Sequence, residues 1–135
     1  MLASFAARYG LDRETALKLA SPFGGGLGRQ GLLCGALTGG IMVLGLHGGR
    51  TRPDDQETRD RNDALVREFT RRFRDGGGSL MCNDLTGVDI SDDVSREAGT
   101  EAGVFDRVCP GVVRRAATLV LELVERPAQE RNSPD

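Results

Sequence analysis

Hydrophobic residues recur at the three- and four-residue spacing of an α-helix along most of the chain. The first 20 residues predict two short helices separated at Gly10, with Leu2 and Phe5 on the buried face of the first and Asp12 as the N-cap of the second. The first helix begins at Met1 with its apolar stripe already running and no capping residue before it. We therefore expect a natural helix to extend upstream of Met1.

Two longer amphipathic helices follow the same spacing. Residues 53–74 begin with polar side chains and then place Leu65, Phe69 and Phe73 at four-residue intervals on one face. Pro110 belongs in the first turn of the last helix, because a proline deeper in a helix clashes and forfeits a hydrogen bond. The last helix carries an apolar stripe made of Phe105, Val108, Cys109, Val112, Ala116, Leu119, Val120 and Leu123.

A nearly uncharged, glycine-rich stretch lies between the first 20 residues and residue 53. Residues 32–46 predict a central buried helix, and Gly31, Gly35 and Gly39 at four-residue spacing would let a neighbouring backbone approach it closely. Its apolar part is shorter than the roughly 20 residues that a membrane span requires. Cys34 lies beside this glycine stripe, so we expect its thiol to be enclosed.

Glycines also mark the two main interruptions of the helical pattern. Residues 22–31 predict a tight loop, and the loop lacks the lysine of a phosphate-binding P-loop. Gly76 to Gly78 should end the helix of residues 53–74, and Ser79 should then cap a short helix that has Cys82 in its first turn.

These elements predict an all-α protein, a single-domain compact helical bundle with a buried glycine-rich central helix. The domain should cover residues 1–126, with a flexible C-terminal tail over residues 127–135, where charged and proline residues cannot pack. A chain of 135 residues with 39% hydrophobic residues is large enough for one such core.

Charge and composition exclude several classes of function. The net charge is −2, and the arginines of residues 53–74 alternate with carboxylates, so we expect neither nucleic acid nor membrane as a partner. His47 is the only histidine, and no pair of carboxylates lies among apolar residues. The chain thus has few candidates for general acid–base catalysis, which disfavours a hydrolase. The chain lacks a secretory signal pattern, so its cysteines suggest a cytoplasmic protein with reduced thiols.

The three cysteines are the candidate functional residues. Cys82 and Cys109 are both predicted at helix N-termini, which lower the pKa of a thiol and favour the reactive thiolate. We therefore expect Cys82 and Cys109 to be more reactive than the enclosed Cys34. Buried structural cysteines are the open alternative, because free cysteine is among the most buried residue types.

Three segments resemble the C_GCAxxG_C_C family of redox-active proteins, in order and over nearly the whole chain. The segments are "FGGGLGRQGLLCGALTGGIMVLGL" with its CGAxxG core at Cys34, "SLMCNDLTGVDIS" around Cys82 and "GVFDRVCPGVV" around Cys109. The resemblance implies a small, mainly helical protein with redox chemistry or iron–sulfur binding. It also implies a fourth cysteine on the N-terminal helix, which this chain lacks. We expect that cysteine to lie upstream of Met1; the alternative is a three-cysteine variant of the family.

The leading hypothesis is therefore a redox-active protein in which Cys34, Cys82 and Cys109 converge on an iron–sulfur cluster or another thiophilic metal. Because clusters usually take four ligands, three thiols would hold one poorly. A metal-free thiol/disulfide redox protein is the second hypothesis, and a non-catalytic helical interaction or dimerisation module is the third. An electron-transfer partner is implied but not identified, and the glycine stripe leaves a homodimer and intrachain packing equally open.

Overall fold

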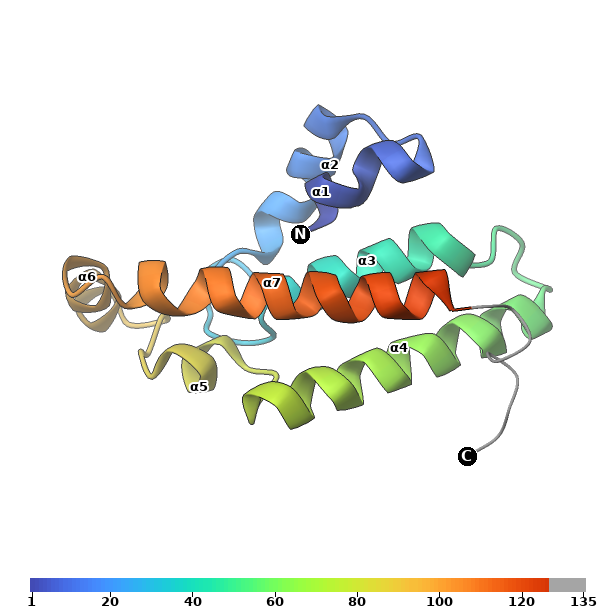
Figure 1. The fold of residues 1–135 in the computed structure, drawn as a ribbon. Helices are drawn as coiled ribbons and strands as arrows, with labels where there is room; N and C mark the ends of the chain where they lie inside the picture. The colour runs from blue at the N-terminus through green and yellow to red at the C-terminus, as the bar shows by residue number, and fades with distance from the viewer. Residues whose placement is uncertain (127–135) are drawn as a thin grey trace.

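Three long helices form the core of the protein (Figure 1). The computed structural model describes residues 1–126, in which α3 (Gly35–Gly48), α4 (Gln56–Gly77) and α7 (Val104–Glu125) all contact one another. The expected flexible tail, residues 127–135, lies outside the described residues. The largest fully buried side chains come from these three helices: Leu37, Val43, Leu44, Phe69, Phe73, Val120 and Leu123.

Shorter helices cover the two sides of this core. On one side α1 (Leu2–Phe5) packs against both α3 and α2 (Arg13–Ala20), and on the other side α5 (Cys82–Thr86) and α6 (Asp93–Glu101) contact α7 (Figure 1). Single 3₁₀ turns cover residues 6–9 and 21–23. The all-α class is confirmed, since the only β pairing within residues 1–126 is one isolated bridge. The single domain is confirmed as well, because the buried apolar side chains of these residues form one core cluster.

The predicted pattern of the N-terminal segment and of α4 is confirmed. Leu2 and Phe5 are buried, and the chain turns at Gly10 with a φ of 70°. Asp12 caps α2, because its side chain accepts a hydrogen bond of 2.9 Å from the backbone N–H of Thr15. In α4, Phe69 is fully buried, as its position on the apolar stripe predicts.

The glycine-rich central helix begins later than predicted. α3 starts at Gly35 instead of residue 32, so Cys34 is its N-cap and not an interior residue. The reason is that the backbone of residues 32–34 pairs with residues 80–82, and the hydrogen bonds of that pairing replace a helical turn. The apolar side chains of Leu32 and Leu33 suit either structure, so the hydrophobic pattern alone does not mark the start of α3.

The last helix begins earlier than predicted, at Val104, so Cys109 and Pro110 lie inside α7 and not in its first turn. Pro110 removes the N–H that would bond the carbonyl of Asp106. Both Pro110 and Asp106 are exposed, so water can satisfy that carbonyl and the helix continues through the proline.

The predicted cap of α5 is also wrong, although Cys82 does lie in the first turn of that helix. Met81 is the N-cap of α5. The Ser79 hydroxyl instead accepts a hydrogen bond from the Met81 N–H and donates one to Asp84, which stabilises the turn before the helix.

Glycines in α3 do allow close helix packing, on two faces. A Cβ atom at Gly39 would lie 2.8 Å from the Cβ of Met1, so this glycine lets α1 approach α3. A Cβ atom at Gly40 would overlap the ring of Phe69 and lie 3.3 Å from Val120, so this glycine lets α4 and α7 approach. Gly31, which we expected on the same stripe, lies outside the helix.

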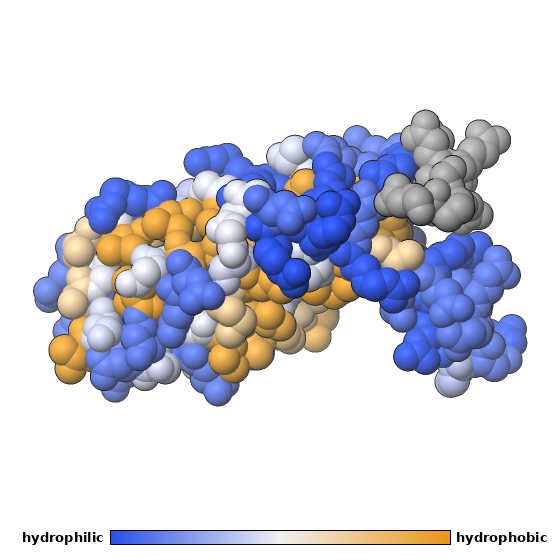
Figure 2. Space-filling model, turned by 90° about the horizontal axis from the view of Figure 1, so that it is seen from below, coloured by the Kyte–Doolittle hydropathy of each residue, from blue (hydrophilic) through white to orange (hydrophobic). Residues whose placement is uncertain are grey.

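One face of the molecule has a more apolar end and a more polar end (Figure 2). Figure 2 shows hydrophobic side chains gathered toward the end of the molecule that carries α5 and α6, whereas the end near the α3–α4 connection is hydrophilic. Within residues 1–126, no helix combines the length and the apolar character needed to cross a bilayer.

Substituting Gly40→Ala should destabilise the fold by about 1–3 kcal/mol, because the added methyl group overpacks the contact with Phe69. The matched control is Gly45→Ala in the same helix, where nothing lies within 4 Å of the added Cβ. This control should gain about 0.5–1 kcal/mol from higher helix propensity. Urea unfolding of both variants measures the difference, and equal stabilities would contradict the packing described for α3.

Candidate functional site

The site is built on an antiparallel bridge that joins two loop segments. The Cys34 N–H donates to the Leu80 carbonyl at 2.9 Å, and the Cys82 N–H donates to the Leu32 carbonyl at 2.6 Å. Side chains alternate between the two faces of a paired segment, so Cys34 and Cys82 lie on the same face as diagonal neighbours. Residues 48 positions apart in the sequence (82 − 34) are thereby brought together.

The start of α5 is also tied to the glycine-rich loop through Asn83. The Asn83 N–H donates to the Gly31 carbonyl at 3.1 Å, and the Asn83 side-chain oxygen accepts from the Ile90 N–H at 2.9 Å. Gly31 has a φ of 70° and packs directly against the Asn83 side chain, so no larger residue fits there without moving Asn83. The sequence analysis missed Asn83, which follows Cys82 in the chain and fixes the loop around it.

The loop of residues 24–31 is tight, as predicted, and its backbone conformation is unusual. Residues 25–29 all have positive φ, including Leu27 at 62° and Arg29 at 65°. The left-handed conformation costs a residue with a Cβ roughly 1–2 kcal/mol. Gly26 is buried against the extended segment of residues 32–34, where a Cβ would lie 2.5 Å from the Leu32 nitrogen. The loop therefore turns the chain so that residues 32–34 arrive extended and pair with residues 80–82.

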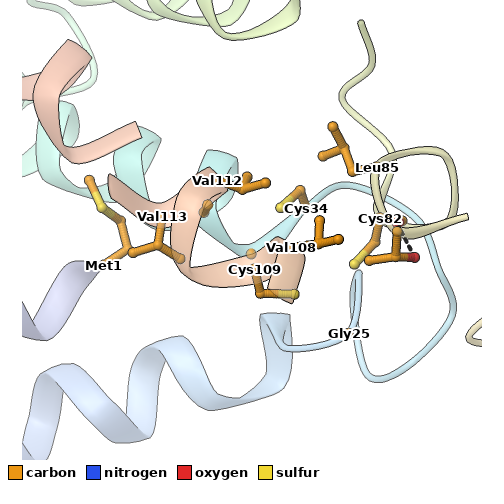
Figure 3. A pocket seen from close by; sticks show the side chains of 12 residues that line it. Met1, Gly25, Cys34, Cys82, Leu85, Val108, Cys109, Val112 and Val113 are labelled. Carbon is orange, nitrogen blue, oxygen red and sulfur yellow. Dashed lines mark hydrogen bonds between the residues drawn. The ribbon is translucent and has the colours of Figure 1, made fainter. Parts of the chain in front are cut away.

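All three cysteines line one partly enclosed cavity of about 220 Å³. Cys34 comes from the start of α3, Cys82 from the start of α5 and Cys109 from α7 (Figure 3). All three are free thiols; Cys82 is buried, and the other two are half-buried. The remaining lining is mainly apolar: Met1, Gly25, Gly35, Ala36, Leu85, Thr86, Val108, Val112 and Val113.

Cys34 is the most acidic thiol of the three. The neighbouring Cys82 thiol, acting as a hydrogen-bond donor, is the main reason why the pKa of Cys34 is lowered to about 6. Burial opposes this change, whereas the backbone N–H groups of Ala36 and Leu37 at the start of α3 favour the thiolate. The positive charge of Arg115 lowers the pKa of Cys34 further.

The other two thiols are held in their protonated form. The pKa of Cys82 is raised, first because its thiol donates to Cys34, and then because of burial and the charges of Cys34 and Cys109. The pKa of Cys109 is raised mainly by burial, with smaller contributions from Cys34 and Asp106. The order of thiol acidity is therefore opposite to the order of reactivity that we expected from the sequence, with Cys82 and Cys109 ahead of Cys34.

This reversal follows from where the helices begin. Cys34 is the N-cap of α3, a helix of 14 residues, whereas Cys109 lies more than one turn inside α7. Cys82 does begin α5, but its backbone N–H is used by the bridge and its thiol faces Cys34. The positive charge of Arg115, on α7, also lowers the pKa of Cys34, and no sequence pattern predicted that these two residues are close.

The cavity does not present a ready metal site. Among the residues that the structure describes, no three histidine, cysteine or acidic side chains form a group that could hold a metal ion. His47 lies elsewhere, where its Nδ1 is 3.3 Å from the Tyr9 hydroxyl. The bridge makes Cys34 and Cys82 neighbours in the cavity, whereas Cys109 lines it from α7.

The fold and the site together define a small all-α protein whose cavity holds an adjacent pair of thiols. The chain belongs to the family described as "Putative redox-active protein (C_GCAxxG_C_C)", whose model matches residues 1–123. The family resemblance of the three cysteine segments is thus confirmed. Comparison with curated proteins and comparison with solved structures gave no match.

The alkylation rate of Cys34 should fall by half as the pH drops through about 6, because only the thiolate reacts. Substituting Cys82→Ala removes the main donor to the thiolate, so the midpoint should move toward the value of about 8.5 for a free thiol. Cys109→Ala is the control, since Cys109 donates no hydrogen bond to Cys34. Iodoacetamide labelling followed by mass spectrometry measures each cysteine, and an unchanged midpoint in Cys82→Ala would contradict the pairing.

The substitution Gly31→Ala should weaken the bridge, because the added methyl group displaces the Asn83 side chain. Gly28→Ala is a matched control: both glycines have positive φ, 70° and 62°, but a Cβ at Gly28 has its nearest neighbour at 3.9 Å. We expect Gly31→Ala to cost about 1–3 kcal/mol more than the control. Amide hydrogen exchange of Cys34 and Cys82 should speed up in Gly31→Ala only; equal exchange in both variants would count against this role for Asn83.

Proposed function

We propose that the protein is a dithiol redox protein in which Cys34 and Cys82 alternate between two thiols and one disulfide. The observation that supports this most is that the bridge makes Cys34 and Cys82 diagonal neighbours on one face, with both thiols on the same cavity. Membership of a family described as redox-active agrees with this function. The metal-free hypothesis from the sequence is therefore the one that the geometry supports best.

The two cysteines have complementary roles in such a reaction. The Cys34 thiolate attacks one sulfur of an oxidised partner, forming a mixed disulfide and releasing the other sulfur as a thiolate. Cys82 then loses its proton and attacks the Cys34 sulfur, which forms the Cys34–Cys82 disulfide and releases the second thiol. The two cysteines lose two electrons in total, and the partner disulfide gains them.

The protonation of the pair suits this order of events. The thiolate is the nucleophile in thiol–disulfide exchange, and the lowered pKa of Cys34 makes it the thiolate at neutral pH. The raised pKa of Cys82 keeps its thiol protonated until the mixed disulfide removes the negative charge of Cys34. Cys82 is then free to act as the resolving thiol.

A second candidate function is the binding of an iron–sulfur cluster or another thiophilic metal. The observation that favours it is that the thiols of Cys34, Cys82 and Cys109 share one cavity. As placed, these thiols do not form a group that fits a metal ion, so they would have to move closer together. No step of the proposed exchange reaction depends on a metal.

Redox titration of the purified protein tests the two functions against each other. Thiol labelling should show two of the three thiols lost in a single two-electron step, with one thiol remaining. Cys34→Ser and Cys82→Ser should each abolish the step, whereas Cys109→Ser should retain it. Circular dichroism controls for folding of each variant.

The alternatives give different results in the same preparation. After anaerobic purification, neither iron nor acid-labile sulfide should be present in a stoichiometric amount. The redox step should also persist in the presence of a chelator. A step that requires iron, or that is lost in Cys109→Ser, would favour the metal site. If neither the protein with iron nor the protein without it shows a reversible redox step, the interaction or dimerisation module is the function that remains.

A further inference from the structure

The cavity that holds the dithiol pair limits what can reach Cys34. Its volume is about 220 Å³, and a cavity of about 150 Å³ is enough for benzene in another protein. Cavities for drug-sized ligands usually begin at about 300 Å³. The part of a partner that lies inside the cavity must therefore be only slightly larger than benzene.

The lining also limits the charge of the partner. Of the described residues around the cavity, none has an acidic or basic side chain, and the larger ones are Leu85, Val108, Val112 and Val113. The Thr86 hydroxyl is occupied, because it donates to the Cys82 carbonyl at 2.8 Å (Figure 3). An ion entering this space would lose hydration and meet mainly apolar side chains, because Arg115 acts on Cys34 from outside the lining, so the lining favours uncharged molecules.

The protonation chemistry of the cavity decides between the two main classes of small oxidant. A hydroperoxide releases an alkoxide or hydroxide ion, a strong base that must be protonated as it leaves, and the protonated ionisable side chains that line the cavity are the weakly acidic thiols of Cys82 and Cys109. A disulfide releases a thiolate, which is a stable anion and leaves without such a donor. The Cys82 thiol is already required as the second nucleophile.

From the size, the apolar lining and the easier departure of a thiolate, we propose that the substrate of this site is a small, uncharged organic disulfide. The assignment rests on the proposed function. The Cys34 thiolate attacks one sulfur of the disulfide RSSR, the S–S bond breaks, and one RS⁻ leaves. Cys82 attacks the Cys34 sulfur, its proton passes to a released thiolate, and the second RS⁻ leaves. The products are the Cys34–Cys82 disulfide, one RSH and one RS⁻.

The test compares three oxidants on the reduced full-length chain: diethyl disulfide, cystine and tert-butyl hydroperoxide. Loss of the Cys34 thiol is followed by quenching and mass spectrometry, and each rate is divided by the rate of the same oxidant with N-acetylcysteine. The ratio for diethyl disulfide should exceed the other two ratios by about tenfold or more, because its ethyl groups are buried in the cavity. An equal or larger ratio for cystine or the hydroperoxide would overturn the assignment.

A cavity-filling variant tests whether the disulfide reacts inside the cavity. Val108→Phe should lower the rate with diethyl disulfide by about tenfold, because the ring occupies the space beside Cys34. Val113→Phe, at a rim position with 36% exposure, is the second variant if Val108→Phe does not fold. The control is Val94→Phe on α6, where the side chain is 76% exposed. Equal rates in a folded cavity variant and in the control would contradict the assignment.

Diamide, a general thiol oxidant, separates failure of the substrate class from failure of the proposed function. If diamide joins Cys34 to Cys82 while diethyl disulfide shows no preference, the dithiol pair stands and the substrate class is wrong. If diamide does not join them, the proposed function is wrong, and the substrate assignment that rests on it is overturned as well.

Discussion

Two backbone hydrogen bonds between residues 32–34 and residues 80–82 determine how the cysteines are arranged. One runs from the Cys34 N–H to the Leu80 carbonyl, and the other runs from the Cys82 N–H to the Leu32 carbonyl. Because each cysteine takes part through its own N–H, the bridge fixes both thiols on one face. The lowered pKa of Cys34 and the raised pKa of Cys82 both follow first from the interaction of these neighbouring thiols.

The glycine-rich loop makes this bridge available. Its positive φ angles turn the chain sharply after α2, and Gly26 and Gly31 let Leu32 and Asn83 approach where a side chain would collide. Leu27 and Arg29 adopt the same left-handed conformation without being glycine. Packing of the loop against the bridge therefore compensates for local strain beside the reactive cysteine, an arrangement common at functional sites.

Much of the fold was predictable because periodic apolar residues dictate buried helical faces. Phe69 and Phe73 on α4 and Asp12 at the start of α2 lie where the pattern places them. The helix starts nearest the cysteines were not predictable, since Leu32 and Leu33 suit a helix or an extended segment equally. Pro110 was misleading for a different reason. The carbonyl that its missing N–H leaves unpaired is exposed and can bind water instead, so the proline is tolerated inside α7. The family motifs identified the three cysteines, but their order of acidity depends on long-range contacts that spacing does not encode.

The most direct test of this account is to map the disulfide formed when the full chain is oxidised. Trypsin separates the three cysteines into peptides 30–50, 75–96 and 108–114, so mass spectrometry of a non-reduced digest identifies any joined pair. The account predicts that peptide 30–50 is joined to peptide 75–96, through Cys34 and Cys82. A predominant link between peptide 30–50 and peptide 108–114, or the absence of any link within one chain, would contradict it.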